Sequence, residues 1–204
     1  MTALNPAQRR IHLAAMRLFA QRGGTQLSIS DLAQEAGVAR GTVYNNVETM
    51  DLLFEQIANQ LRQEMHQRIS ASIAAVQDPA ERLAYGVRFF IRRAHDEPQW
   101  AAFLTRFALS TASLRELFYS QAAADVLQGL SAGRYQFHQE QLASVIALIG
   151  TGTLGAMTLV NGGIKTWRTA GTETVELLLL AMGLERHEAE AMANLELPPL
   201  AVLD

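Results

Sequence analysis

The sequence predicts an all-α fold, and two observations support this prediction. Helix-forming residues (Ala, Leu, Gln, Glu and Arg) dominate, while runs of β-branched residues are scarce. Apolar residues recur at spacings of three and four, the period of an amphipathic helix, between glycine and proline breaks. A chain of 204 residues is long enough for a small helical domain joined to a larger one.

Three short helices are expected in a first domain at residues 1–48. Asn5-Pro6 begins the first helix, and Gly23-Gly24 ends it. Ser28 is placed to cap the second helix, and Gly37 ends that helix because glycine adopts positive φ without steric cost. The third helix is expected over about 39–46.

A second, larger helical domain is expected at residues 49–204. Proline and glycine positions and apolar spacing place its helices near residues 49–69, 80–95, 98–109, 113–130, 138–160 and 172–182, with a short polar helix before Pro198-Pro199. The segment with Trp167 and Gly171 is expected to be a loop, with Thr172 as the cap of the helix that follows.

The charge distribution is uneven, although the whole chain has a net charge of −3. Residues 1–47 hold five arginines against Asp31 and Glu35, a balance of +3. Residues 48–204 hold twelve basic and eighteen acidic residues, a balance of −6. A basic head on an acidic body is typical of a protein that turns one end toward phosphates, although ordinary surface variation produces the same imbalance.

Several classes of function lack the residues that they need. The chain has no cysteine, which excludes disulfides and thiolate metal sites and fits a reducing cytoplasm. The opening MTALNPAQRR lacks the apolar core of a secretory signal. No nucleophile elbow, P-loop or H-E-x-x-H motif is present, and the five histidines are scattered. We therefore predict a cytoplasmic protein that is not an enzyme and that has no cofactor and no metal site.

Residues 142–164 carry no charge over 23 positions, a length that could span a bilayer. The segment contains several glycines and threonines, and neither an aromatic belt nor a polybasic flank accompanies it. We expect a helix buried in a core or in a subunit interface. A membrane-associated protein is the weaker alternative.

The most informative stretch is residues 27–53, LSISDLAQEAGVARGTVYNNVETMDLL, which predicts two short helices joined by a tight turn. Ala33 is small enough for the helices to cross closely, Gly37 makes the turn, and Val43 fills the shared core. The outward and flanking positions of the later helix are then Arg40, Gly41, Thr42, Tyr44, Asn45 and Asn46. Arg can bind guanine, Asn can bind adenine, and Thr and Tyr bond bases or phosphates. The stretch therefore predicts a DNA-reading helix-turn-helix, with a plain helical hairpin as the alternative.

The run from Arg10 to Leu53, with IHLAAMRLF, a GG break and SISDLAQEAGVARGTVY, resembles the amino-terminal domain of TetR-family transcriptional regulators. Trp167, the apolar helix VELLLLAM and Gly183-Leu184 are similar to the tail of many members. Residues 60–160 match only as a succession of helices. The resemblance implies a homodimer with DNA-binding domains at one end and a ligand-binding, dimer-forming body at the other.

The resemblance also implies DNA contacts for individual residues. Ser28 matches the phosphate-facing residue at the start of the second helix, and Arg40, Gly41 and Thr42 match the base-reading start of the third. Tyr44 matches the usual tyrosine, while Asn45 and Asn46 stand where a tyrosine or histidine commonly contacts phosphates.

Two positions depart from the family's pattern. Val47 stands where the family has an aromatic residue, and Met50 stands where a phosphate-binding lysine is frequent. Losing one cation per half-site should flatten the salt dependence of binding by roughly 0.9 per lost contact, so DNA binding is expected to be weaker or more selective.

The uncharged helix is the expected dimer interface. A stripe of mostly small residues at spacings of three and four allows helices to approach closely: Ala143, Ala147, Gly150, Thr151, Leu154 and Thr158. We predict a homodimer through the helices near 138–160 and 172–182, with burial inside one subunit as the alternative.

A pocket for an unidentified small-molecule effector is expected among the middle helices. Its candidate walls are Tyr85, Phe89, Phe90, Trp100, Phe103, Phe107, Phe118 and Met157. Its candidate polar contacts are Arg88, Arg92, Arg106 and His95. For each aromatic residue taken singly, ordinary core packing is the commoner explanation.

The sequence thus predicts a ligand-responsive transcriptional regulator, a repressor that binds a palindromic operator in double-stranded DNA as a dimer. The alternative is a helical ligand-binding or protein-interaction dimer whose head has lost its DNA-binding function.

Overall fold

The computed structural model describes residues 4–203, and the side chains of residues 118–121 lie outside the described set. Within that range the chain forms helices and loops only, which confirms the predicted all-α fold. The helices are α1 (Pro6–Arg22), α2 (Ile29–Ala36), α3 (Arg40–Tyr44), α4 (Met50–Ser72), α5 (Pro79–Asp96), α6 (Pro98–Phe107), α7 (Ala112–Ser131), a short 3₁₀ helix (Gln139–Gln141), α8 (Leu142–Asn161), α9 (Trp167–Ala181) and α10 (Arg186–Ala193).

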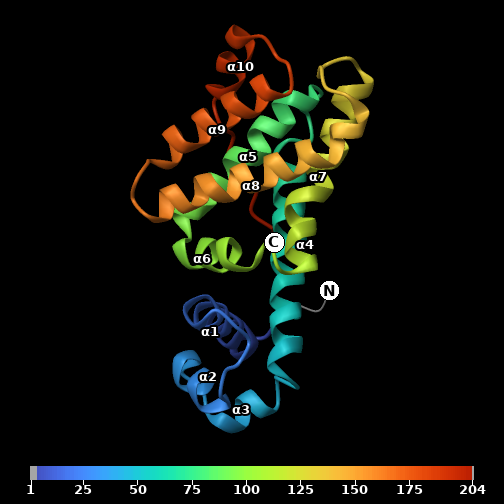
Figure 1. The fold of residues 1–204 in the computed structure, drawn as a ribbon. Helices are drawn as coiled ribbons and strands as arrows, with labels where there is room; N and C mark the ends of the chain where they lie inside the picture. Colours follow the sequence, from blue (N-terminus) through green and yellow to red (C-terminus); the bar gives the residue numbers. More distant parts are fainter. Residues whose placement is uncertain (1–3, 204) are drawn as a thin grey trace.

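Helices α1 to α3 form a small head below a larger body made of α4 to α10 (Figure 1). The head's first helix begins as the sequence indicates, because the Asn5 side chain accepts a hydrogen bond from the Gln8 amide at 2.9 Å. It ends at Gly23, which has a φ of +76°.

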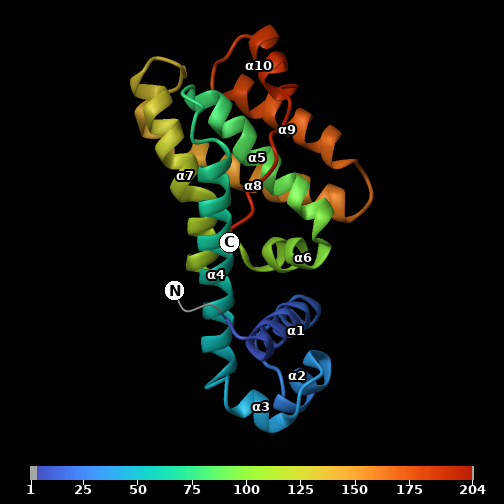
Figure 2. The same ribbon diagram turned by 180° about the vertical axis from the view of Figure 1, so that it is seen from behind.

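Helix α4 belongs to both parts and connects them (Figures 1 and 2). One buried face runs along its whole length, with Leu53 and Phe54 at the head end and Met65 and Ile69 at the body end. The expected boundary between residues 48 and 49 therefore falls next to the start of a shared helix, and head and body are coupled through a rigid element.

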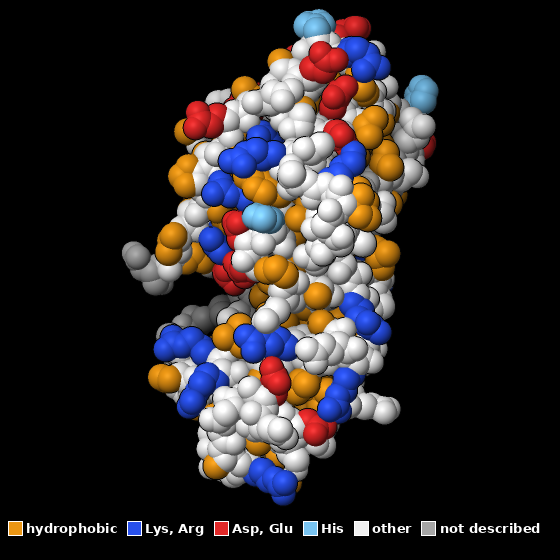
Figure 3. Space-filling view, turned by 90° about the vertical axis from the view of Figure 1, so that its left-hand side faces the viewer, with side chains coloured by type: hydrophobic (Ala, Val, Ile, Leu, Met, Phe, Trp, Pro, Cys, Tyr) orange, Lys and Arg blue, Asp and Glu red, His pale blue; other side chains and the backbone are white. Residues whose placement is uncertain are grey.

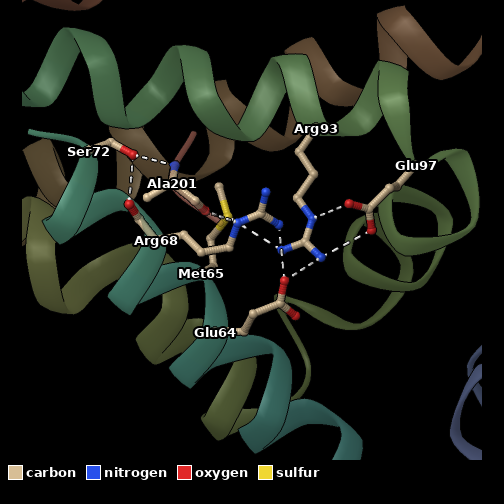
Figure 4. Close-up of polar contacts among 7 residues, drawn as sticks. All are labelled: Glu64, Met65, Arg68, Ser72, Arg93, Glu97 and Ala201. Atoms are coloured by element: carbon tan, nitrogen blue, oxygen red, sulfur yellow. Dashed lines mark hydrogen bonds and ion pairs between the residues drawn. The ribbon is translucent and has the colours of Figure 1, made fainter. Parts of the chain in front are cut away.

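Helix α5 is the centre of the body and packs against α7, α8 and α9, while α10 covers α9. A set of polar contacts ties α5 to α4 (Figure 4). The Arg93 guanidinium, only 6% exposed, contacts Glu64 of α4 at 3.0 Å and donates two hydrogen bonds to Glu97, each 3.0 Å long. The C-terminal tail joins this set, because Arg68 Nε donates to the Ala201 carbonyl at 2.8 Å.

An aromatic cluster forms the joint between head and body. Phe19 of α1 meets Phe54 of α4 edge-on, with ring centroids 5.4 Å apart. Phe54 in turn contacts Phe103 at 5.3 Å and Phe107 at 5.0 Å, both on α6. Such pairs contribute about 0.5–1.5 kcal/mol each beyond the burial of their area.

One expected loop is helical. Helix α9 begins at Trp167, because the Thr166 hydroxyl accepts a hydrogen bond from the Thr169 amide at 3.1 Å and caps the helix. The expected cap at Thr172 is therefore wrong, and Gly171 lies inside the helix. The third helix also ends earlier than expected, at Tyr44.

The joint predicts a large cost for removing one of its rings. Replacing Phe103, which is fully buried, with Ala should lower the free energy of unfolding by about 3–5 kcal/mol because it leaves a cavity between head and body. Chemical denaturation measures this. Leu109→Ala is the control, because Leu109 is exposed in the connection between α6 and α7. Its free energy of unfolding should stay within about 0.5 kcal/mol of the wild-type value. Similar losses in both variants would contradict the assignment of the cluster as the joint.

Candidate nucleic-acid interface

The turn between α2 and α3 is built by a cap at one end and a glycine at the other. The Ser28 hydroxyl accepts a hydrogen bond from the Asp31 amide at 3.0 Å, which starts α2. Gly37 ends α2 with a φ of +62°, and the amide of Val38 donates to the Ala33 carbonyl at 3.0 Å. These contacts fix the angle at which α3 leaves α2.

Helix α3 turns one side inward and the other to solvent. Val43 is fully buried, together with Leu32 and Ala33 of α2, as the motif predicts. Tyr44 is 68% exposed, and Arg40, Gly41 and Asn45 are exposed as well. The structure therefore presents Arg40, Gly41 and Tyr44 of α3, together with Asn45 at the C-terminal cap of the helix, to solvent.

Two of the predicted contact residues are partly used by the fold. Thr42 and Asn46 are half-buried, and Asn46 Nδ2 donates to the Thr42 carbonyl at 2.7 Å. The Ser28 hydroxyl is committed to its cap, although the side chain stays exposed. Ser28, Thr42 and Asn46 therefore each take part in a hydrogen bond within the head and still lie at least partly at its surface.

The arginines of the head differ in how they are neutralised. Arg22 pairs with Asp31 at 2.8 Å, and Arg17 pairs with Glu35 at 3.5 Å. The hydrogen bond from Ser28 and the ion pair with Arg22 lower the pKa of the Asp31 carboxyl. Among residues 4–203, no acidic side chain lies within 4 Å of the Arg40 guanidinium. Its charge is therefore available to an external anion.

Gly41 has no packing reason to be a glycine. A Cβ at this position would meet no atom within 4 Å, and the residue is exposed inside a helix. Glycine weakens a helix by about 0.5–1 kcal/mol relative to alanine. The missing side chain instead lets an external surface approach the backbone of α3 closely.

The two positions that depart from the family's pattern are structural here. Val47 is buried and its amide donates to the Val43 carbonyl at 2.9 Å. Met50, the first residue of α4, packs half-buried against the core. Thr49 caps α4 by accepting from the Leu52 amide at 3.1 Å. Neither Val47 nor Met50 places a cation at the start of α4.

A small cavity of about 50 Å³ lies in the body between α4, α5, α7 and α8. Its polar wall is the ion pair between Arg82 and Asp125, 2.7 Å apart, of which Asp125 is only 3% exposed. Arg82 is held further by the carbonyl of Gln77 at 2.8 Å. Sequence reasoning missed this pair, because its two members are 43 positions apart on different helices and no local pattern connects them.

The predicted ligand residues lie mostly in the core, and of those described Phe90 lines this cavity. Tyr85, Phe89, Trp100, Phe103 and Met157 are buried, and Phe107 is half-buried in the aromatic joint. Arg92 lies over the Trp167 ring at 5.3 Å from its centroid. The Phe118 side chain lies outside the described residues. Contact of these residues with a ligand stays a prediction.

Helices α8 and α9 leave one face of the body uncovered by the described residues 4–203. Of the predicted stripe, Ala143, Ala147, Thr151 and Thr158 are exposed, while Gly150 and Leu154 are buried within the subunit. Two leucines stand in the same two helices, Leu148 at 47% and Leu177 at 67% exposure. Exposed leucines among small residues are typical of a surface that another helix pair covers.

The helical segment Gln139–Asn161 is long and apolar enough to cross a membrane, with a mean hydropathy of 1.8, and it is the one such segment within residues 4–203. Length and composition alone do not separate a membrane span from the core helix of a soluble protein. In this structure α8 packs against α5, α7 and α9, which accounts for its apolar inner face.

A three-helix head with an exposed third helix, set on a helical body, defines the class of helix-turn-helix transcriptional regulators. The family described as "Bacterial regulatory proteins, tetR family" matches residues 11–57, and "Tetracyclin repressor-like, C-terminal domain" matches residues 78–195. The second match alone covers more than half of the chain. The chain belongs to the TetR family of transcriptional regulators.

Relatives and solved structures agree with this family. Uncharacterized HTH-type transcriptional regulators from two strains of Mycobacterium tuberculosis are 32% identical over 96 residues, which is 47% of this chain. The match covers 48% of those proteins, so the chain spans about half the length of the curated relatives it matches.

Solved structures extend the likeness of fold over most of the chain. RolR in complex with resorcinol has a TM-score of 0.72 at 20% identity, covering 96% of both chains. A TetR-family regulator from Shewanella sp. PV-4 has a TM-score of 0.72 at 21% identity, covering 89% of this chain and 100% of that one. FadR from Bacillus subtilis with stearoyl-CoA has a TM-score of 0.72 at 17% identity, with coverages of 87% and 99%.

The two glycines of the helix-turn-helix should respond differently to alanine. Gly37→Ala forces a side chain into the left-handed region and should lower the free energy of unfolding by about 1–2 kcal/mol. Gly41→Ala meets open space in a helix and should leave stability unchanged or raise it by about 0.5–1 kcal/mol. Thermal and chemical unfolding of the two variants measure the difference. Equal losses would show that Gly41 also serves the fold.

Proposed function

We propose that this protein is a ligand-responsive repressor that binds a palindromic DNA operator as a homodimer. The observation that carries the proposal is the outer face of α3, where Arg40 is unpaired among the described residues and Gly41 lies open. This face favours DNA binding over the alternative, a head that has lost its function, because folding alone requires neither residue.

The chemistry of the face fits a major groove. An α-helix enters that groove with its N-terminal residues on the base edges, and Arg can bond guanine through two atoms. Tyr44, one turn further, can reach a phosphate or a base, and the absent side chain at Gly41 lets the helix approach. The exposed Ser28 at the start of α2 adds a contact to the backbone of the duplex.

A dimer would give two heads that read two half-sites. The faces of α8 and α9 supply its interface, and half-sites would lie about 34 Å or a multiple of this apart. A dimer with a two-fold axis requires a palindromic site.

The size of the body cavity favours a ligand that binds by pushing apart the helices that line the cavity. At about 50 Å³ it holds little more than water as it stands, so a ligand must widen it. RolR is solved with resorcinol and FadR with stearoyl-CoA. The small cavity and the Arg82–Asp125 pair favour a compact polar ligand over a long acyl chain.

The lining explains how such a ligand would act at a distance. His66 and Ile69 of α4 line the cavity, and the same helix packs into the head through Leu53 and Phe54. Widening the cavity would therefore shift the head. A coupling of about 1–3 kcal/mol changes operator occupancy 5- to 150-fold.

The reading face is tested with an operator selected from a random DNA pool. Arg40→Ala and Tyr44→Ala should each weaken binding about tenfold or more in a titration at fixed salt, because each removes a contact to the duplex. Arg186→Ala is the matched control, since it removes an exposed arginine far along the chain on α10. Gly41→Ala should weaken DNA binding while keeping the stability predicted above. Wild-type affinity in the Arg40 and Tyr44 variants would refute the proposal.

The dimer is tested by placing a charge on its expected face. Leu177→Glu should give a monomer in sedimentation or light scattering, because a buried unpaired carboxylate opposes association. Leu127→Glu, on α7 at 45% exposure, is the control and should keep the wild-type mass. If the Leu177→Glu variant stays dimeric, the dimer interface does not lie on this face of α8 and α9.

The body cavity is tested by filling it. A Cβ at Gly86 meets no atom within 4 Å, and this residue lines the cavity. A screen of small compounds first identifies an effector that releases the wild-type protein from operator DNA. The Gly86→Leu variant should stay bound to the operator at the effector concentration that releases the wild-type protein. Gly86→Ala should fold at least as stably as the wild type. Release of the Gly86→Leu variant at the wild-type concentration would place the effector outside this cavity.

A further inference from the structure

The chain after α10 runs down the body to α4 as a segment that forms no helix (Figures 1 and 2). Pro198 and Pro199 lie in its middle, and because proline has a fixed φ and no N–H, this stretch does not continue a helix. Leu197 and Leu200, on either side of the prolines, pack against the core. We refer to residues 195–203 as the tail strap.

A buried arginine of α5 holds the first residue of the tail strap. Arg88 is 8% exposed, and its guanidinium donates a hydrogen bond to the Leu195 carbonyl. Among residues 4–203, no acidic side chain lies within 4 Å of this guanidinium. A buried charge needs hydrogen-bond partners to offset the loss of its hydration. The strap carbonyl therefore stabilises Arg88 as much as Arg88 holds the strap.

Two side chains of α4 bind the other end of the tail strap at a single residue (Figure 4). The Ala201 amide donates to Ser72 Oγ at 2.8 Å, and the Ala201 carbonyl accepts from Arg68 Nε at 2.8 Å. The Ser72 hydroxyl in turn donates to the Arg68 carbonyl at 2.8 Å. Both main-chain polar groups of Ala201 are therefore satisfied by α4.

The attachment at Ala201 is continuous with the contacts that hold α4 to the body (Figure 4). Arg68 Nη1 lies 3.1 Å from Glu64 Oε1, and the same oxygen lies 3.0 Å from Arg93 Nη2. Arg93 also donates to Glu97 at 3.0 Å. A chain of polar contacts thus leads from the tail strap to the junction of α5 and α6.

The position of the head depends on the position of α4. Figure 3 shows a notch between head and body on its left edge, and the head contacts the body through α1 with α6 and through α4. Leu203, at the end of the tail strap, lines a surface groove together with residues of α1 and α4. The strap therefore runs from α10 to the level of the head and binds the helix that carries the head.

From these contacts we propose that the tail strap is a conformational restraint on the head. While attached, it holds α4, and through α4 the head, in the arrangement seen here, and its release lets the head move. Hydrogen bonds and two leucine side chains hold the strap, so its release would unfold no helix. The effect on DNA binding rests on the proposed function, whereas the restraint itself does not.

Two variants of the full chain release the tail strap in different ways. Ser72→Ala removes the acceptor of the Ala201 amide, and Leu200→Ser removes an apolar contact with the core. Ser70→Ala, at an exposed position of α4, makes the same change in helix propensity and is the first control. Val202→Ser, at a residue of the strap that is 86% exposed, is the second.

Hydrogen–deuterium exchange of the protein without DNA tests the restraint. In both strap variants we expect the amides at the head end of α4, residues 53–61, to exchange about two- to tenfold faster, as expected for the loss of one neutral hydrogen bond or a similar contact. Both controls should exchange as the wild type does. The proposal is overturned if faster exchange is confined to residues 69–72, or if the controls behave as the strap variants do.

A titration with the selected operator at fixed salt tests the effect on DNA binding. Ser72→Ala should bind the operator about two- to tenfold more weakly than Ser70→Ala, because a head that moves spends less time in the arrangement that binds. Equal affinities would overturn the control of DNA binding by the strap. If the wild-type protein binds no DNA, the proposed function fails, and the exchange experiment still decides whether the strap restrains the head.

Discussion

The buried guanidinium of Arg93 fixes the helix that carries the head to the rest of the molecule. A charge that is 6% exposed must be paired, because leaving it without a partner costs about 3–5 kcal/mol. Here Glu64 of α4 and Glu97 at the junction of α5 and α6 both bind it, and the Trp100 ring lies beneath it. Three helices thus contact the Arg93 side chain, and these contacts fix the position of α4 relative to the body.

Because α4 is one continuous helix that the Arg93 contacts hold near its middle, a shift at one end of α4 would be transmitted to the other end. The head end packs against Phe19 through Phe54, and the body end contributes His66 and Ile69 to the small cavity. The C-terminal tail adds a further restraint, since Ala201 is bonded to both Arg68 and Ser72 of the same helix. A displacement at the cavity therefore has to turn α4 about the Arg93 contacts or break them.

The sequence predicted those features that depend on a few neighbouring residues. Helix starts at Asn5, Ser28 and Thr49 follow from side-chain caps, which act over three positions. The start of α9 was predicted wrongly for the same reason, because Thr166 and Thr172 are equally good caps and only packing selects between them. The outward face of α3 was predictable because a helix has a fixed period.

Features that need distant residues could not be predicted in this way. The Arg82–Asp125 pair joins α5 to α7, so no spacing along the chain reveals it. The aromatic residues expected at a ligand are the clearest case. Hydrophobicity marks Phe103 and Phe107 as buried, but only the fold decides whether a buried ring faces a cavity or another ring.

Three glycines show how the fold separates structural from functional positions. Gly37 needs its positive φ to make the turn, so the fold itself explains it. Gly41 and Gly86 lie inside helices, and a Cβ at either would meet no atom of the described chain within 4 Å. Glycine weakens a helix at such positions, and departures of this kind from local preference are expected where function sets the requirement. Gly41 lies on the face proposed for DNA and Gly86 on the wall of the body cavity. Gly155, exposed inside α8, is a further helical glycine whose Cβ would meet no atom of the described chain within 4 Å, and it lies on a helix proposed for the dimer interface.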